Sequence, residues 1–158
     1  MKFYRYKTSV FPKSCLNLVP SPDGPAVVAA GPSNPLNMEI LSKILIAFVA
    51  VEHLYILWLE MFAWETRGRQ VFKGSLKDEL FTPTKTLAAN QGLYNGFLAA
   101  GLIWSFLISD AEWSRNVALF FLGCVITAGT YGAVTASRKI FFVQAVPAIL
   151  ALAVLLLR

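Results

Sequence analysis

Ionisable side chains interrupt an apolar stretch near the middle of the chain. Glu52, His53 and Glu60 stand in the run from Ile40 to Phe62, which is otherwise largely apolar. At 100° per residue these three side chains share an arc of roughly 100° on a helix. A charged group at the centre of a membrane costs about 2.5–3.5 kcal/mol, so such residues usually face the protein interior and mark proton or ion sites. The sequence therefore predicts one acidic, imidazole-bearing helix face directed into the protein.

A second set of polar side chains opens the next apolar stretch. Asn90, Gln91, Tyr94 and Asn95 cover an arc of about 140° on a helix. Carboxamides and a phenol can donate hydrogen bonds to carboxylates. We expect them to meet the first set inside the protein. The third and fourth apolar stretches add one polar residue each, Tyr131 and Gln144. The predicted buried polar site comprises Glu52, His53, Glu60, Asn90, Gln91, Tyr94, Asn95, Tyr131 and Gln144.

Other polar residues in the last two stretches are expected to be structural. They are Thr127, Thr130 and Thr135. A threonine hydroxyl in a membrane helix usually donates a hydrogen bond to the backbone carbonyl one turn earlier. Pro147 lacks a backbone N–H, so it frees a carbonyl near Gln144 and favours a local distortion of the helix.

The elements that position these residues follow from hydropathy. Only 15% of the residues are charged, against about 25% in a typical soluble domain. Four stretches reach the roughly 20 apolar residues needed to cross a bilayer, and they run over about 40–62, 87–108, 116–136 and 140–157. Within lipid each segment must satisfy its own backbone, which favours helices. Short connections favour antiparallel neighbours, so we predict an all-α integral membrane protein, a four-helix up-down bundle.

The start of the chain differs from the rest. Residues 1–37 contain six of the eight prolines, and because proline kinks or breaks a helix in its interior, such a stretch cannot hold a helix for long. We therefore predict a disordered proline-rich extension over 1–37 and a membrane domain over 38–158.

The positive charge has a membrane explanation. The net charge is +5, and the connections 63–86 and 137–139 together hold seven basic residues. Basic residues concentrate in cytoplasmic loops of membrane proteins, so both connections are predicted to be cytoplasmic. The expected partner is the lipid bilayer and not nucleic acid.

Two further expectations concern ligands and partners. Gly92, Gly96 and Ala100 form a ridge of small residues of the kind that lets membrane helices approach closely, which suggests a homo-oligomer formed through this ridge. A metal site is not expected, because the single histidine and the distant cysteines Cys15 and Cys124 provide too few ligands. No cofactor is predicted.

Three sequence segments resemble a known family. They are the run from Glu52 to Thr66, the run from Leu87 to Gly101, and Gln144-Ala-Val-Pro147. In these segments the chain resembles the domain of unknown function 1304 family, small predicted membrane proteins that are mostly bacterial and partly fungal. The resemblance covers about residues 40–157. It implies a four-span protein of the bacterial plasma membrane and no particular activity.

Three functions therefore stay open. The polar site suits a small proton- or cation-linked transporter, or a subunit of one. It also suits a membrane-embedded enzyme that acts on a lipid or isoprenoid, with a glutamate as general acid or base. The third alternative is a structural or partner-binding protein in which the polar network fixes helix register. Whether the protein is an enzyme is not decided by these residues.

Overall fold

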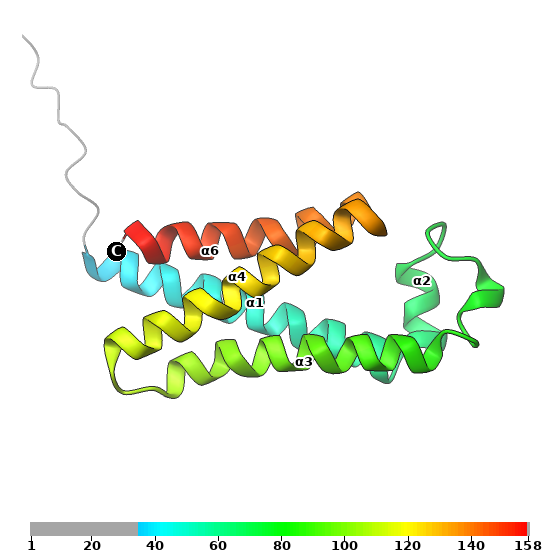
Figure 1. The fold of residues 1–158 in the computed structure, drawn as a ribbon, viewed down its shortest axis with the longest axis horizontal. Helices are drawn as coiled ribbons and strands as arrows, with labels where there is room; N and C mark the ends of the chain where they lie inside the picture. Colours follow the sequence, from blue (N-terminus) through cyan, green and yellow to red (C-terminus); the bar gives the residue numbers. More distant parts are fainter. Residues whose placement is uncertain (1–34, 158) are drawn as a thin grey trace, which may run out of the picture. The chain divides into compact units, whose positions relative to one another are not determined.

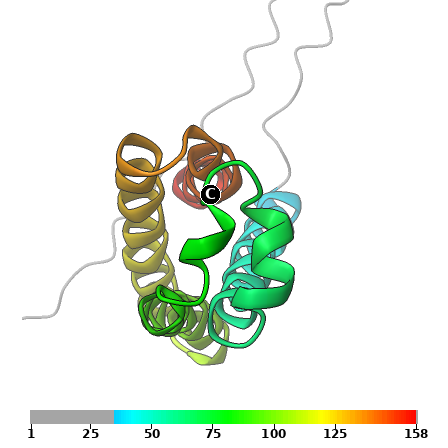
Figure 2. The same cartoon turned by 90° about the vertical axis from the view of Figure 1, so that its right-hand side faces the viewer.

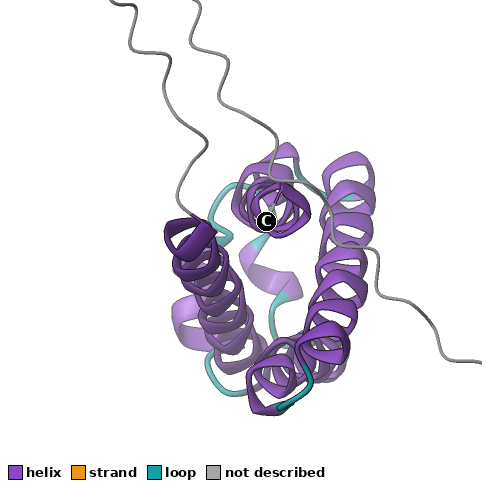
Figure 3. Ribbon diagram, turned by 90° about the vertical axis from the view of Figure 1, so that its left-hand side faces the viewer, coloured by secondary structure: helices purple, strands orange, loops and turns teal. Residues whose placement is uncertain are grey.

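The computed structural model describes residues 35–157 of the chain. This part is helical, and the connections between its helices are short apart from the one after the first helix (Figure 3). The predicted disordered extension over 1–37 falls almost entirely outside the described residues. Its last three residues belong to the first helix, α1, which runs from Pro35 to Met61. Proline is common in the first turn of a helix, because its φ angle is already helical and the N–H it lacks would have no partner there.

Four long helical segments make up most of the described structure. They are α1 (Pro35–Met61), α3 (Lys85–Leu107), α4 (Ala111–Thr135), and a last run that comprises α5 (Arg138–Ile140), the wide turn η3 (Phe141–Ala145) and α6 (Val146–Leu157). Helix α1 packs against α3 and α6, and α4 packs against α3 and the last run. Figures 1 and 2 show these helices side by side around a common centre.

Three of these segments are long and apolar enough to cross a membrane, namely Leu36–Met61, Ala111–Thr135 and Arg138–Leu157. Helix α3 is of similar length, but its N-terminal half carries Asn90, Gln91 and Asn95, which lower its mean hydropathy. The chain therefore has apolar helices of the kind found in membrane proteins, and α3 is not one of the three that are long and apolar enough to cross a membrane.

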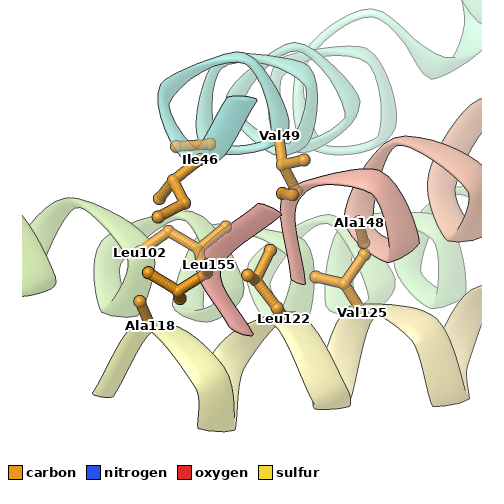
Figure 4. Packing of buried hydrophobic residues seen from close by; sticks show 10 residues of the cluster. Ile46, Val49, Leu102, Ala118, Leu122, Val125, Ala148 and Leu155 are labelled. Atoms are coloured by element: carbon orange, nitrogen blue, oxygen red, sulfur yellow. The ribbon is translucent and has the colours of Figure 1, made fainter. Parts of the chain in front are cut away.

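The core at the centre of these helices is apolar. Ile46 and Val49 of α1 meet Leu122 and Val125 of α4 in one buried cluster, to which Leu102 of α3 also belongs. Figure 4 shows these side chains directed toward one another, together with Ala148 and Leu155 of the last helix. Burial of such side chains is the main source of close, ordered packing between the helices.

The distortion predicted near Pro147 is present. The wide turn η3 covers Phe141–Ala145, directly before this proline. A wide turn of this kind relieves the helix where a backbone N–H is missing. The three threonines of α4 also behave as predicted: Thr127, Thr130 and Thr135 each donate to the carbonyl four residues earlier.

Candidate polar site between the first two long helices

His53 is the most deeply buried ionisable residue among the predicted site residues. It lies in the middle of α1, and its side chain is 1% exposed. Its Nδ1 atom lies 2.9 Å from the carbonyl oxygen of Val49. A carbonyl can only accept, so Nδ1 carries the hydrogen and Nε2 is the nitrogen that can take up a proton. The imidazole is thus fixed in orientation and left with one basic atom.

Glu60 lies two turns further along the same face of α1. Its carboxylate accepts a hydrogen bond from Nδ2 of Asn95 on α3, at 2.9 Å. The same amide nitrogen also donates to the carbonyl of Gln91, at 3.1 Å. The bond between Glu60 and Asn95 is a direct polar link between the two helices.

The glycines of α3 make this link geometrically feasible. A Cβ atom on Gly92 would lie 2.8 Å from Cγ of Met61 and 3.0 Å from Cβ of Glu60. A Cβ atom on Gly96 would collide with the side chain of Leu57. Without side chains at these two positions, α3 approaches α1 closely enough for Asn95 to reach Glu60. Of the predicted ridge of small residues, Gly92 is buried against α1, Gly96 is half-buried and Ala100 is exposed, and the homo-oligomer expected through this ridge stays a prediction.

Glu52 precedes His53 but points about 100° away around the helix. It is half-buried, and its Oε2 atom is buried without a hydrogen-bond partner among residues 35–157. A buried carboxylate oxygen without a hydrogen-bond donor costs free energy, so binding of a proton or a cation to Glu52 would stabilise the protein.

The other predicted site residues do not join this group. Tyr94 is 53% exposed and Tyr131 is 71% exposed, and Asn90 and Gln91 are exposed as well. The prediction that these four lie inside the bundle is wrong. The glycine face of α3, and not its amide face, turns toward α1, so most of the 140° polar arc remains outside.

Gln144 occupies a different place again. It is half-buried in the wide turn η3, where its Cβ lies 3.2 Å from the place that a Cβ on Gly129 would occupy. The predicted site thus reduces to Glu52, His53, Glu60 and Asn95 along the α1–α3 pair. In the part of the chain that the structure describes, no three His, Cys, Asp or Glu side chains converge as metal ligands would.

The exit from α1 forms a contact network that the sequence patterns did not reveal. Trp64 donates from Nε1 to the hydroxyl of Thr84, at 3.2 Å, and its ring packs against those of Phe72 and Phe81. Glu65 forms an ion pair with Lys85, at 2.7 Å. Trp64 and Thr84 lie twenty residues apart in the chain, as do Glu65 and Lys85, and helical periodicity cannot detect contacts over such a separation.

The pKa of Glu65 is lowered, first by its hydrogen bond from Lys85 and second by the hydrogen bond from Thr82. Because its pKa is lower in the folded chain than in the unfolded one, the ionised carboxylate contributes stability that is fully present above the unfolded pKa. This stability is lost as the pH falls through the folded pKa. We therefore expect Glu65→Gln to lower the thermal midpoint at neutral pH and to have no effect in strong acid.

The measurement is the thermal midpoint of both chains in detergent across the acid range. Glu79→Gln, which changes an exposed glutamate of the same connection, provides the matched control and should leave the pH curve unchanged. A difference between wild type and Glu65→Gln that persists undiminished into strong acid would contradict this assignment.

The comparisons with known proteins agree with the resemblance found in the sequence. The family model "Protein of unknown function (DUF1304)" matches residues 47–156. The chain is 37% identical over 116 residues to "Uncharacterized protein YpaA" of Lactococcus lactis subsp. lactis (strain IL1403), covering 73% of this chain and 96% of the relative. No solved structure matches the chain significantly. The chain thus belongs to the family of proteins of unknown function DUF1304.

Proposed function

We propose that the chain is a four-span integral membrane protein in which α3 is the fourth span and successive spans cross in opposite directions. Helix α3 has 23 residues, about 34 Å at the rise of an α-helix, which is enough for the hydrocarbon core. Its packing along α1 and the bond from Asn95 to Glu60 support this placement. The basic connections 63–86 and 137–139 would then face the cytoplasm of a bacterial cell, in agreement with the bacterial relative.

The function that the geometry supports best is the handling of a proton or a small cation by the α1–α3 polar face. The observation that carries this proposal is His53, buried at mid-span with Nδ1 fixed and Nε2 left as a proton acceptor. Glu60 lies seven residues on, about 10 Å along the same face, and Glu52 has a buried oxygen without a donor. Ionisable groups at this depth are costly to retain for packing alone.

The apolar core makes this a gated site and not an open pore. Ile46 and Val49 precede His53 on α1 and pack with Leu102 and Leu122. Figure 4 shows these side chains filling the space between the helices. A proton or ion could reach His53 from the end of the bundle that carries the connection 63–86. It could continue to the opposite end only when the side chains of the apolar core move apart, as alternating access requires.

The test is a flux measurement in liposomes. Purified protein is reconstituted, a potential is imposed with potassium and valinomycin, and proton entry is followed with a trapped pH-sensitive dye. We expect flux above that of protein-free liposomes, with a loss of most of it in His53→Ala and Glu52→Gln. Glu112→Gln, which changes an exposed glutamate in the first turn of α4, should keep wild-type flux. Equal flux in wild type and in both site variants would eliminate the proposal and favour a structural role for the polar face.

A second candidate is an enzyme acting on a membrane lipid or isoprenoid. The observation in its favour is the exposure of Asn90, Gln91 and Tyr94 on the outer side of α3, next to the Asn95–Glu60 pair. A lipid-borne substrate arriving sideways would meet these groups first, with Glu60 as general acid or base. Incubation with membrane lipids, followed by mass spectrometry, should then show a product that Glu60→Gln does not form. Identical lipid profiles with and without wild-type protein would remove this candidate.

A further inference from the structure

A cavity of about 340 Å³ lies at the end of the described structure where α1 begins, away from the predicted polar site. Its walls come from the first turns of α1, the end of α3, the first turns of α4 and the end of α6. Its polar lining consists of Glu39, Ser42, Lys43, Ser105, Ser109, Ser114 and Arg115. None of the residues predicted to form the buried polar site contributes to it.

The cavity has an excess of positive charge. Its lining includes two basic side chains, Arg115 and Lys43, and one carboxylate, that of Glu39. Lys43 bonds Glu39 at 2.8 Å, but the two side chains are 56% and 39% exposed, and ion pairs this exposed contribute little. Lys43 can therefore turn to a ligand at small cost. Arg115 has a buried Nε atom without a hydrogen-bond partner among residues 35–157, so its guanidinium retains an unused buried donor.

The serines supply a complementary chemistry. The hydroxyls of Ser42, Ser105 and Ser114 donate to backbone carbonyls, at 2.8, 2.6 and 2.7 Å. Their protons are engaged. Ser42 and Ser105 are only 0% and 2% exposed, so the serine oxygens that a ligand in the cavity can reach as acceptors are those of the half-buried Ser114 and the exposed Ser109. A ligand that suits the cavity thus carries an anionic group for Arg115 and Lys43, together with donors such as hydroxyls for the serine oxygens.

The position of the cavity identifies the class of ligand. Three of the four helices that line it are long and apolar enough to cross a membrane, and the lining residues lie near helix ends, which would be the level of lipid headgroups. The deeper wall is apolar, with Ile46, Ala118 and Leu155, and these residues also belong to the apolar core. A cavity that is cationic at the membrane surface and apolar below fits an amphiphile better than a free ion.

We propose that this cavity binds the phosphate headgroup of an anionic membrane lipid, with Arg115 as the principal contact to the phosphate and Lys43 as the second. The serine oxygens accept hydrogen bonds from headgroup hydroxyls such as those of phosphatidylglycerol. The site is independent of the proton or cation function, because Ser42 and His53 are eleven residues apart on α1, about 16 Å.

The experiment is native mass spectrometry of the full chain in detergent, titrated with phosphatidylglycerol and, separately, with phosphatidylcholine. Wild type should retain phosphatidylglycerol in preference to phosphatidylcholine. Arg115→Gln should raise the apparent Kd for phosphatidylglycerol by about tenfold or more, as expected for the loss of a charged hydrogen bond. Lys43→Gln should have a smaller effect. Lys77→Gln, which removes an exposed positive charge in the connection after α1, should bind as wild type does.

Two controls separate binding from folding and lipid from free anion. Arg115→Lys keeps the charge and should keep most of the preference, while circular dichroism checks the helix content of each variant. Inorganic phosphate is added as a competitor and should not displace the lipid. Equal retention of both lipids by wild type, unchanged binding in folded Arg115→Gln, or displacement of phosphatidylglycerol by inorganic phosphate alone would each overturn the proposal.

Discussion

Phe81→Ala should lower the free energy of unfolding by about 3–5 kcal/mol, the usual cost of removing a fully buried aromatic side chain. Phe81 is 0% exposed, although it lies in the connection between α1 and α3. Its ring lies 5.1 Å from that of Trp64, and the guanidinium of Arg69 lies 5.2 Å above it. Removal of the ring takes away the packing partner of Trp64 and the aromatic face beneath Arg69 at once. Denaturant titration in detergent micelles, followed by circular dichroism, measures the loss.

The same substitution should also open the connection locally. Lys73 and Lys77 are exposed residues of this connection, and trypsin should cut there faster in Phe81→Ala than in wild type. Phe62→Ala is the matched control, because Phe62 is 72% exposed at the end of α1, and its stability and cleavage should stay close to those of wild type. If Phe81→Ala unfolds at the same denaturant concentration as Phe62→Ala, Phe81 does not hold the connection together.

Hydropathy predicted where the long helices lie, because long apolar stretches form helices, and three of these helices are long and apolar enough to cross a membrane. The errors lie at the ends. The third stretch was expected from Asn116, but α4 begins at Ala111, because the carboxylate of Asp110 accepts a hydrogen bond from the backbone N–H of Trp113, at 2.8 Å. Asp110 and Glu112, which precede the expected stretch, thus belong to the helix as its cap and part of its first turn.

The polar site was predicted only in part, for a physical reason. Helical periodicity shows which side chains share a face, such as His53 and Glu60, which lie seven residues apart within the helix α1. It does not show which face of the partner helix turns inward. On α3 the closest approach is made at Gly92 and Gly96, so Asn95 beside them reaches Glu60 and Tyr94 stays exposed. The small residues determine which face of α3 contacts α1, and this contact in turn determines which polar residues are buried and which are exposed.

Two identical glycine substitutions in α4 should differ in their effect on stability, because the space around the two glycines differs. A Cβ atom on Gly129 would lie 2.9 Å from the backbone nitrogen of Ala145 and 3.1 Å from its Cβ. The obstacle is backbone of the wide turn η3 and cannot rotate away, so Gly129→Ala should destabilise the protein by about 1–3 kcal/mol, as overpacking does. A Cβ atom on Gly123 would meet nothing within 4 Å. There alanine only improves helix propensity, and Gly123→Ala should leave stability unchanged or raise it by up to about 1 kcal/mol.

Denaturant titration of both variants in the same detergent measures the difference, since each change adds one methyl group to the same helix. The outcome bears on how the last helix is held, because Gly129 is what lets η3 lie directly against α4 and brings Gln144 to that contact. Equal effects of the two substitutions would mean that η3 does not approach α4 so closely in the membrane. Loss of stability in Gly129→Ala alone would establish that close backbone approach, and not side-chain polarity, fixes the last helix on α4.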